Sequence, residues 1–516
     1  MFRRRIGAAL ATVSLLAVAA CSPGEGVDLE NNGGTGGAEA SGSGETLVAA
    51  IAGEPDQLDP HKTSAYFSFQ VLENVYDTLV EPDESLEMQP ALAKSWEVSD
   101  DQLTWTFTLR EDVTFHDGSE FSAEDVVYSY NRIIDNELTN SYRFASVESI
   151  KAPDPSTVVI KVSQPTPSLL SNIGGFKGMA IVSEENVKSG EIQDNPIGTG
   201  PFVFESYTPG DSIKLSSNPD YWGGAPELGG ATFRFISEGT TALAGLTAGE
   251  VDWTDSIPPQ RVAGLETNPD VEVGKVASND YWYLALNQNR EPYDDVRVRQ
   301  AIAYALDRDA ITQAVSYGNA TVNQLAIPKQ STWYTEYNKY SKNLDKAKSL
   351  LDEAGVDELN MGLMVTTQYP QTVTAAQVIA DQLSKIGITT EIRTIDFATW
   401  LDEQSQGNFD MLMLGWLGSI DPNDFYYNQH HSEGTSNFQG YSNPEVDKLL
   451  EAGQTETNLE KRQEIYDKAA TMIADDASYI YLYNPDVVQA WNPNVKGYEA
   501  RSDRAIRFRD VSLADN

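Results

Sequence analysis

The most informative stretch of the chain reads Pro90-Ala91-Leu92-Ala93-Lys94-Ser95-Trp96-Glu97-Val98-Ser99, and Leu103-Thr104-Trp105-Thr106-Phe107-Thr108-Leu109 follows shortly after it. In the second run every other residue is large and apolar, and the residues between are threonines. Successive side chains of a strand point to opposite faces, so a repeat of two gathers the apolar ones on one face. The run therefore predicts a half-buried strand, with Leu103, Trp105, Phe107 and Leu109 on its buried face.

The residues after this strand complete a longer pattern. They are Arg110, Val113-Thr114-Phe115-His116-Asp117-Gly118 and Ala123-Glu124-Asp125-Val126. The whole pattern resembles the signature of the oligopeptide/dipeptide/nickel-binding family of solute-binding proteins (bacterial extracellular solute-binding protein family 5), which serve ABC importers. Further matches to the family occur in order along the chain, at Leu58-Asp59-Pro60, Val75-Tyr76-Asp77-Thr78-Leu79, Gly198-Thr199-Gly200-Pro201-Phe202, Asn218-Pro219-Asp220-Tyr221-Trp222, Gly249-Glu250-Val251-Asp252, Asp295-Val296-Arg297-Val298-Arg299-Gln300-Ala301 and Gly415-Trp416. Because they cover nearly all of the chain beyond residue 45, the chain is similar to this family over its whole globular part.

For the fold, the resemblance implies an α/β protein of the two-lobed periplasmic-binding-protein type (class II), with a ligand cleft between the lobes. Two crossing strands form the hinge, and the first lobe carries an extra subdomain. The first lobe is expected at residues 46–66, 188–283 and 485–516. The extra subdomain is expected at 67–187 and the second lobe at 284–484.

For function, the resemblance implies the substrate-binding component of an ABC importer. Such a protein closes its lobes around an oligopeptide or dipeptide and delivers it to permease subunits in the membrane, while an ATPase supplies the energy. Two alternatives stay open. The same transport role could serve an oligosaccharide or another small polar solute, or the fold could serve a ligand-sensing or adhesive surface protein.

The resemblance also implies which segments meet the ligand. Peptide binders of this family hold an extended ligand by main-chain pairing with both lobes, which gives affinity without recognising side chains. The matching segments here are Gly53-Glu54-Pro55-Asp56 in the first lobe and Gly415-Trp416-Leu417-Gly418-Ser419 in the second. Trp416 is expected to form an apolar wall of the ligand pocket, although a tryptophan after a strand can also pack into a core.

One position departs from the family. Many peptide-binding members carry an acid three residues after this tryptophan, and it pairs with the ammonium group of the peptide. Here that position is Ser419, and the next acid is Asp421. Asp421 could take over the ammonium, or it could cap the turn before Pro422; both alternatives are open.

The N-terminus predicts export and a membrane anchor. Arg3, Arg4 and Arg5 precede a short apolar run that ends in small residues before Cys21, the single cysteine of the chain. This arrangement is typical of a secretory signal over residues 1–20 and resembles a bacterial lipobox, whose cysteine receives a lipid. Residues 21–45 are rich in glycine, serine and acids and are expected to form a flexible tether. We expect a protein anchored by lipid on the outer face of the cell membrane, or on its periplasmic side where a second membrane exists. The alternative is an ordinary signal peptide with an incidental cysteine.

The charge and the cysteine content exclude some partners and some kinds of stabilisation. The net charge of −41 repels nucleic acid, so none is expected as a partner. A single cysteine allows no internal disulfide, so stability must come from packing. We expect a monomer.

Neither catalysis nor metal binding finds support in the sequence. The adjacent pair His430 and His431 could hold a metal, but no third ligand has suitable spacing, and we favour an exposed loop pair. The glycines of Gly198-Thr199-Gly200-Pro201 predict a turn into a strand at Phe202–Phe204 rather than a phosphate-binding loop. A nucleophile elbow, a zinc-protease helix and a dinucleotide fingerprint are all missing from the sequence. We expect no enzyme, no cofactor and no metal, which disfavours an exported hydrolase.

The second half of the chain alternates helix and strand patterns. This rhythm predicts a mainly parallel sheet. The expected elements are helices at 296–315, 345–354, 372–386 and 397–404, and strands at 361–366, 388–395 and 409–415.

Overall fold

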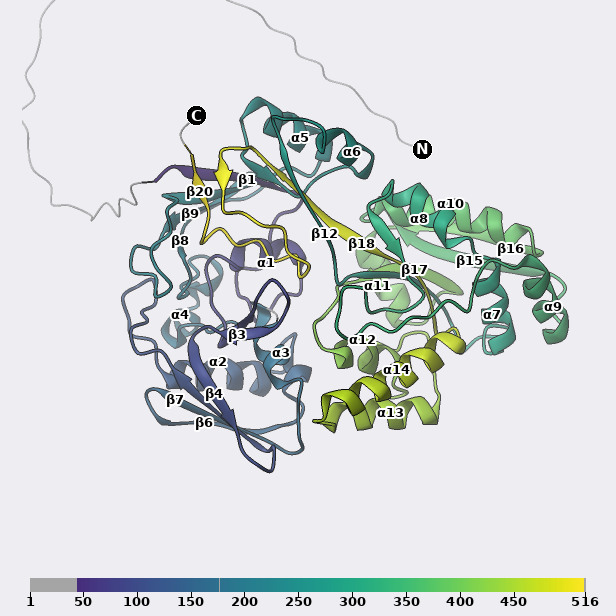
Figure 1. Cartoon of the computed structure of the whole chain (residues 1–516), viewed down its shortest axis with the longest axis horizontal. Coiled ribbons are helices and arrows are strands. Elements are labelled where there is room, and N and C mark those ends of the chain that lie inside the picture. Colours follow the sequence, from purple (N-terminus) through teal and green to yellow (C-terminus); the bar gives the residue numbers. More distant parts are fainter. Residues whose placement is uncertain (1–43, 176, 515–516) are drawn as a thin grey trace, which may run out of the picture. The chain divides into compact units, whose positions relative to one another are not determined.

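The computed structural model describes residues 44–175 and 177–514. The predicted signal peptide, Cys21 and all but the end of the predicted tether lie outside these residues. The described part forms two lobes, and one sheet of twelve strands runs through both of them (Figure 1). Its order is β16-β15-β17-β13-β18-β11-β1-β10-β9-β8, and β12 and β14 both pair with β18.

The first lobe is built on the β11-β1-β10-β9-β8 part of this sheet. Strand β1 runs parallel to β10 and β11, whereas β9 is antiparallel to both of its neighbours. The predicted strand at Phe202–Phe204 is confirmed as part of β8. The elements of this lobe are β1 (Thr46–Ile51), α1 (Tyr66–Leu72), α4 (Glu184–Ser189), η3 (Glu191–Gln193), β8 (Phe202–Thr208), β9 (Ser212–Ser217), β10 (Gly230–Phe235), α5 (Gly239–Ala248), β11 (Trp253–Thr254), η4 (Pro259–Arg261), α6 (Val262–Leu265), β12 (Glu272–Ala277), β19 (Val495–Lys496) and β20 (Ser512–Leu513).

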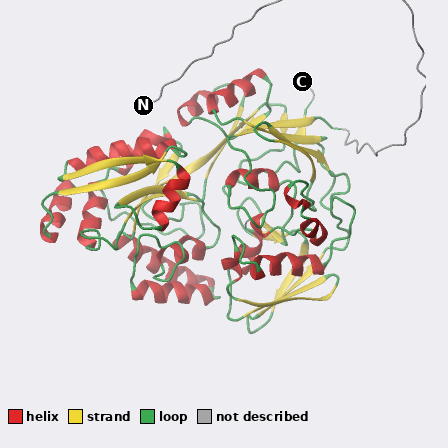
Figure 2. Cartoon of the chain, turned by 180° about the vertical axis from the view of Figure 1, so that it is seen from behind, coloured by secondary structure: helices red, strands yellow, loops and turns green. Residues whose placement is uncertain are grey.

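A separate antiparallel sheet, β4-β5-β7-β6, forms the extra subdomain with α2 and α3 (Figure 2). Strand β5 confirms the predicted alternation, because Trp105, Phe107 and Leu109 are buried and the threonines between them are half-buried. The core of this subdomain includes Leu79 and Ile181, while α1 packs into the core of the first lobe. The elements are β2 (Val80–Pro82), β3 (Met88–Pro90), β4 (Ala93–Val98), β5 (Thr104–Leu109), α2 (Ala123–Asp135), η1 (Ser141–Phe144), β6 (Val147–Asp154), β7 (Thr157–Val162), α3 (Leu169–Gly174) and η2 (Lys177–Met179).

The second lobe follows the predicted alternation of helix and strand. Strand β15 runs parallel to β16 and β17, as expected, but β17 is antiparallel to β13, and β13 is antiparallel to β18. The sheet of this lobe is therefore mixed rather than mainly parallel. The elements are β13 (Tyr281–Leu286), α7 (Val296–Ala305), α8 (Arg308–Ser316), β14 (Ala320–Val322), α9 (Leu344–Ala354), β15 (Leu359–Thr366), α10 (Pro370–Ser384), β16 (Ile388–Ile395), α11 (Phe397–Ser405), β17 (Met411–Trp416), α12 (Pro422–His430), α13 (Pro444–Thr455) and α14 (Leu459–Asp475).

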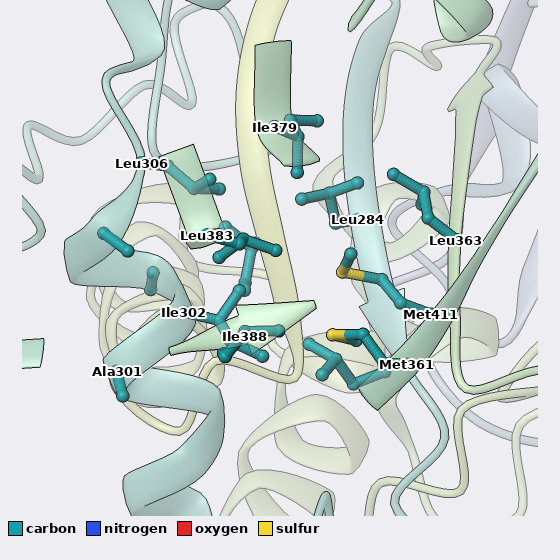
Figure 3. Close-up of a cluster of buried hydrophobic side chains, with 14 of the residues drawn as sticks. Leu284, Ala301, Ile302, Leu306, Met361, Leu363, Ile379, Leu383, Ile388 and Met411 are labelled. Atoms are coloured by element: carbon teal, nitrogen blue, oxygen red, sulfur yellow. The ribbon is translucent and has the colours of Figure 1, made fainter. Parts of the chain in front are cut away.

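The sheet of the second lobe is buried on both faces. On one face α7 and α10 cover the strands, and Ile302 and Leu383 lie beside Ile388 (Figure 3). Along β17, Met411 belongs to this core and Leu412 to the core on the opposite face. A strand covered on both faces needs a continuous apolar run instead of an alternating one, which is what residues 411–414 provide.

One expected helix is wrong. The pattern at 296–315 predicts a single helix, but the structure divides it into α7 and α8. The backbone is extended at Leu306, and the Asp307 carboxylate accepts a hydrogen bond from the Ala310 amide at 3.0 Å. Aspartate is a favoured N-cap, so a new helix begins here. The buried Arg308 holds the break in place by donating to the Tyr481 carbonyl at 2.8 Å.

Strand β18 (Tyr479–Trp491) belongs to both lobes. Its first half pairs with β13 and β14 of the second lobe, and its second half pairs with β12 and β11 of the first. Strands β12 and β13 are separated by residues 278–280 alone, so a second connection crosses beside β18 (Figure 1). These two crossings form the hinge of the two-lobed fold.

Candidate ligand-binding cleft

A cavity of about 1450 Å³ lies between the two lobes. Typical small-molecule pockets have about 300–1,000 Å³, so this cavity can hold a ligand of several residues. Its wall includes the loop after β1, helix α1, the loop after β11, η1 of the extra subdomain, the hinge, the loop after β17 and the C-terminal segment. The lining residues used below are Glu54, Asp56, Tyr66, Gln70, Glu73, Arg143, Asp255, Asn279, Asp280, Gly415, Trp416, Leu417, Gly418, Ser419, Asp424, Asp503, Arg504 and Arg507.

In the predicted first-lobe segment, Glu54 and Asp56 line the cavity, but Pro55 between them does not. The Glu54 carboxylate accepts hydrogen bonds from the Tyr207 hydroxyl and from the Gly210 amide, and these bonds lower the pKa of Glu54 in that order of importance. The Asp56 carboxylate accepts from the Thr63 and Ser68 hydroxyls at 2.6 and 2.7 Å. Both acids already have partners within their own lobe.

In the predicted second-lobe segment, all five residues from Gly415 to Ser419 line the cavity. Trp416 is half-buried and also packs against a core of its lobe, so both expectations for this residue describe part of its surroundings. Gly418 passes so close to the hinge that a Cβ atom would lie 1.7 Å from the Asn279 carbonyl oxygen. Its amide donates to Asp280 Oδ1 at 3.0 Å, and this bond fixes the loop to the hinge.

Asp421, for which the sequence left two roles open, does not line the cavity. Its Oδ1 accepts from the Asn423 amide at 3.0 Å, so it caps α12, the second alternative left open by the sequence. The guanidinium of Arg462 in α14 donates a hydrogen bond to each carboxylate oxygen of Asp421, at 2.7 and 2.8 Å. The exposed fractions of the two side chains are 8% and 4%, so the pair is buried. Buried in this pair and outside the cavity lining, Asp421 does not face a ligand.

The carboxylate that faces the cavity from α12 is Asp424, which sequence reasoning missed. Its Oδ2 accepts from the Ser419 hydroxyl at 2.7 Å and from Arg143 at 3.0 Å. Because Arg143 belongs to η1 of the extra subdomain, this ion pair joins the two sides of the cleft. Asp421 and Asp424 lie one turn apart on α12, and the sequence does not show which of them Arg462 buries.

At the hinge, Arg504 of the C-terminal segment lines the cavity. Arg504 donates to Asp280 Oδ2 at 2.6 Å and lies over the Tyr66 ring, 4.6 Å from its centre. The Tyr66 hydroxyl and the Gln70 amide donate to Asp255 Oδ2 at 3.2 and 2.6 Å. Burial raises the pKa of Asp255. The sequence pattern singled out none of these residues, which come from four segments far apart in the chain: α1, the loop after β11, the hinge and the C-terminal segment.

The histidine pair does not form an exposed loop, and that expectation is wrong. His430 is the last residue of α12, and both histidines are buried. The two ring nitrogens of His430 contact the Ser478 and Tyr481 hydroxyls at 2.9 and 2.8 Å. Within residues 44–175 and 177–514, no three or more histidine, cysteine or acidic side chains are grouped so that they could hold a metal ion.

Comparison with known proteins identifies the family. The model of "Bacterial extracellular solute-binding proteins, family 5 Middle" matches residues 87–438. The chain belongs to this family. The family match confirms the resemblance found in the sequence. Solved structures of relatives confirm the two-lobed α/β fold.

Relatives of this family 5 protein bind different solutes. The chain is 30% identical to "Heme-binding protein A" of Haemophilus influenzae, over 89% of this chain and 90% of the relative. It is 28% identical to "Probable D,D-dipeptide-binding periplasmic protein DdpA" of Escherichia coli, over 88% and 91%. Among solved structures, the Helicobacter pylori protein DppA in complex with the peptide STSA has 29% identity and a TM-score of 0.82, over 92% of this chain and 98% of that one. AgaA from A. tumefaciens R10, in complex with agropinic acid, has 27% identity and a TM-score of 0.81, over 91% and 99%.

Family 5 proteins are extracytoplasmic solute-binding proteins that work with ABC transporters. In the described part of this family 5 protein, none of the helices is both long and apolar enough to cross a membrane.

Proposed function

We propose that this family 5 protein captures an oligopeptide or dipeptide outside the cytoplasm and delivers it to the permease of an ABC importer. The observation that carries the proposal is the cavity between the lobes, which has room for several peptide residues and is lined by the complete Gly415–Ser419 loop. A relative with a TM-score of 0.82 is described with a bound peptide, which supports the same ligand class here.

Capture follows from closure of the lobes. A ligand that touches both walls makes all its contacts in the closed state alone, so it shifts the open–closed equilibrium by its differential affinity. The hinge allows this motion because two connections link the lobes. The pair Arg143–Asp424 lies across the cleft and forms only when the walls meet. The closed, loaded monomer then docks on the permease.

A thermal-shift screen tests the ligand class. At about one hundred times its dissociation constant, a ligand that does not bind the unfolded chain adds about 2.7 kcal/mol to the free energy of unfolding. We expect a clear rise in melting temperature with one or more members of a synthetic di- to pentapeptide library. The panel also contains oligosaccharides, agropinic acid, heme and nickel salts. A response to one of these and to no peptide would overturn the peptide proposal while leaving solute binding intact.

We also propose that Cys21 carries a lipid that holds the protein on the outer face of the cell membrane. The support is its position as the single cysteine, after a signal-like segment and before a tether-like one. Cys21→Ser should release the protein from membranes or leave it unprocessed. Membrane fractionation with mass measurement of the mature N-terminus checks this, with Ser22→Ala as the control that should behave as wild type. A processed Cys21→Ser protein that stays with the membrane would contradict the anchor.

A further inference from the structure

We propose that Gln70, Asp255 and Asn279 form a subsite for the α-ammonium group of a peptide ligand. The inference rests on the proposed function, because it names the part of the cavity that recognises the peptide's free N-terminus. It places the ammonium on the first lobe and the hinge, and not on the loop of the second lobe where the sequence pattern suggested Asp421.

The first line of support is a group of incomplete polar side chains at the hinge end of the cavity. Gln70, Asp255, Asn279 and Arg504 all line it, and each has a buried polar atom without a hydrogen-bond partner among the described residues. These atoms are Gln70 Oε1, Asp255 Oδ1, Asn279 Oδ1 and Arg504 Nε. A buried polar atom without a partner is costly, so such a group indicates a ligand or water that completes it.

The second line of support is that the two amides have fixed orientations. The amide nitrogen of Gln70 donates to Asp255 Oδ2 at 2.6 Å, which leaves its oxygen as the free acceptor. The amide nitrogen of Asn279 donates to the Ser419 carbonyl at 3.0 Å, which again leaves the oxygen. Gln70 and Asn279 are only 1% and 4% exposed, so these oxygens do not reach bulk water. The subsite therefore offers three acceptors, one of which belongs to a carboxylate.

The third line of support is charge. Asp255 forms no ion pair with any described residue, and its Oδ2 is held by the neutral Gln70 and Tyr66 side chains. The charge of Arg504 partly offsets the burial of Asp255, but Arg504 is itself paired with Asp280, and burial still raises the pKa of Asp255. Four other cavity acids have arginine partners, in the pairs Glu73–Arg507, Asp280–Arg504, Asp424–Arg143 and Asp503–Arg501, whereas Glu54 and Asp56 are each held by two neutral donors. A carboxylate withdrawn from water without an ion pair of its own is disfavoured, and a ligand cation would reduce this penalty.

These features fit an α-ammonium group. An ammonium has three N–H donors and one positive charge, which matches three acceptors with one negative charge. The spare donor of Arg504 suits the carbonyl oxygen next to that ammonium in a peptide. Asp424 fits less well, because Arg143 and the Ser419 hydroxyl already satisfy its Oδ2.

The test measures calorimetric affinity for the tightest peptide of the library, with a free and with an N-acetylated terminus. Asp255→Asn should weaken the free peptide about a hundredfold or more, because an ammonium loses its charged partner, and should weaken the acetylated form far less. Asp424→Asn is the comparison variant: it breaks the pair across the cleft, so it should weaken the free and acetylated peptides alike and leave the preference for the free terminus as in wild type. Circular dichroism and melting temperature establish that each variant is folded.

A second variant guards against a fold defect in Asp255→Asn. Gln70→Met removes one neutral acceptor and should weaken the free peptide about tenfold, again more than the acetylated one. The subsite is overturned if both variants weaken the two forms equally or not at all, or if Asp424→Asn alone abolishes the preference. Failure of every library peptide to bind the wild type would instead overturn the proposed peptide function.

Discussion

Replacing Asp421 by alanine should lower the free energy of unfolding by about 3–5 kcal/mol. The variant leaves Arg462 buried without a carboxylate, and it also removes the N-cap of α12. Arg462 cannot easily turn to water, because it donates to the Gly453 carbonyl at 2.8 Å and lies over the rings of Trp333 and Tyr466. Removing one partner of a buried ion pair lowers stability far more than replacing both partners by apolar residues, because the charge that remains is not solvated.

Urea unfolding of the wild type and three variants checks this expectation. The double variant Asp421→Ala/Arg462→Met should recover part of the loss, because no buried charge remains. The matched control is Glu445→Ala, which breaks the exposed pair with Lys468 and should change stability much less. A small effect for Asp421→Ala, similar to that of Glu445→Ala, would contradict the buried pair.

Acidification should destabilise the protein through its buried histidines. Burial lowers the pKa of His430 from its ordinary value of 6.5 to about 3. Between these values the unfolded chain binds a proton that the folded protein does not, so stability is complete above about pH 6.5 and falls as the pH decreases. One such proton contributes a slope of about 1.4 kcal/mol per pH unit. His61, whose pKa burial lowers to about 4, acts in the same direction over a narrower range.

The pH dependence of urea unfolding from pH 7 to 4.5 measures this slope. His430→Gln retains a polar side chain that cannot take up a proton. The free energy of unfolding of this variant should therefore change less with pH, by up to about 1.4 kcal/mol per pH unit. The comparison cancels the contribution of the carboxylates, which both proteins share. Parallel curves for the wild type and His430→Gln would show that His430 does not control the acid stability.

The sequence predicted those elements whose pattern is local. The alternation of β5 and the strands and helices from Met361 to Gly415 depend on neighbours along the chain, and they are confirmed within a few residues. The direction of β13 and β18 was beyond such a pattern, because their pairing joins residues about two hundred positions apart. The break between α7 and α8 left a local trace in Asp307, a favoured N-cap, which the apolar spacing on both sides concealed.

The sequence predicted which loops line the candidate site, but not which of the charged side chains face the cavity. Family resemblance located the loops at 53–56 and 415–419, and most of their residues line the cavity. Whether an acid faces the cavity depends on its partner, and the partners of Asp421 and Asp424 are Arg462 and Arg143 in other parts of the chain. For the same reason Asp255 carried no signal, since its surroundings come from α1, the hinge and the C-terminal segment.

The core of the first lobe unites both ends of the globular chain, with Leu47 near its start and Val511 near its end. Asn74 makes two hydrogen bonds with the C-terminal segment, one to the Ile506 carbonyl and one from the Phe508 amide, both at 3.0 Å. Contacts so distant in sequence form late in folding. This core therefore stays incomplete until residues 506–511 have left the ribosome. In a family that works outside the cytoplasm, this delay favours a chain that is still unfolded when it meets the export machinery.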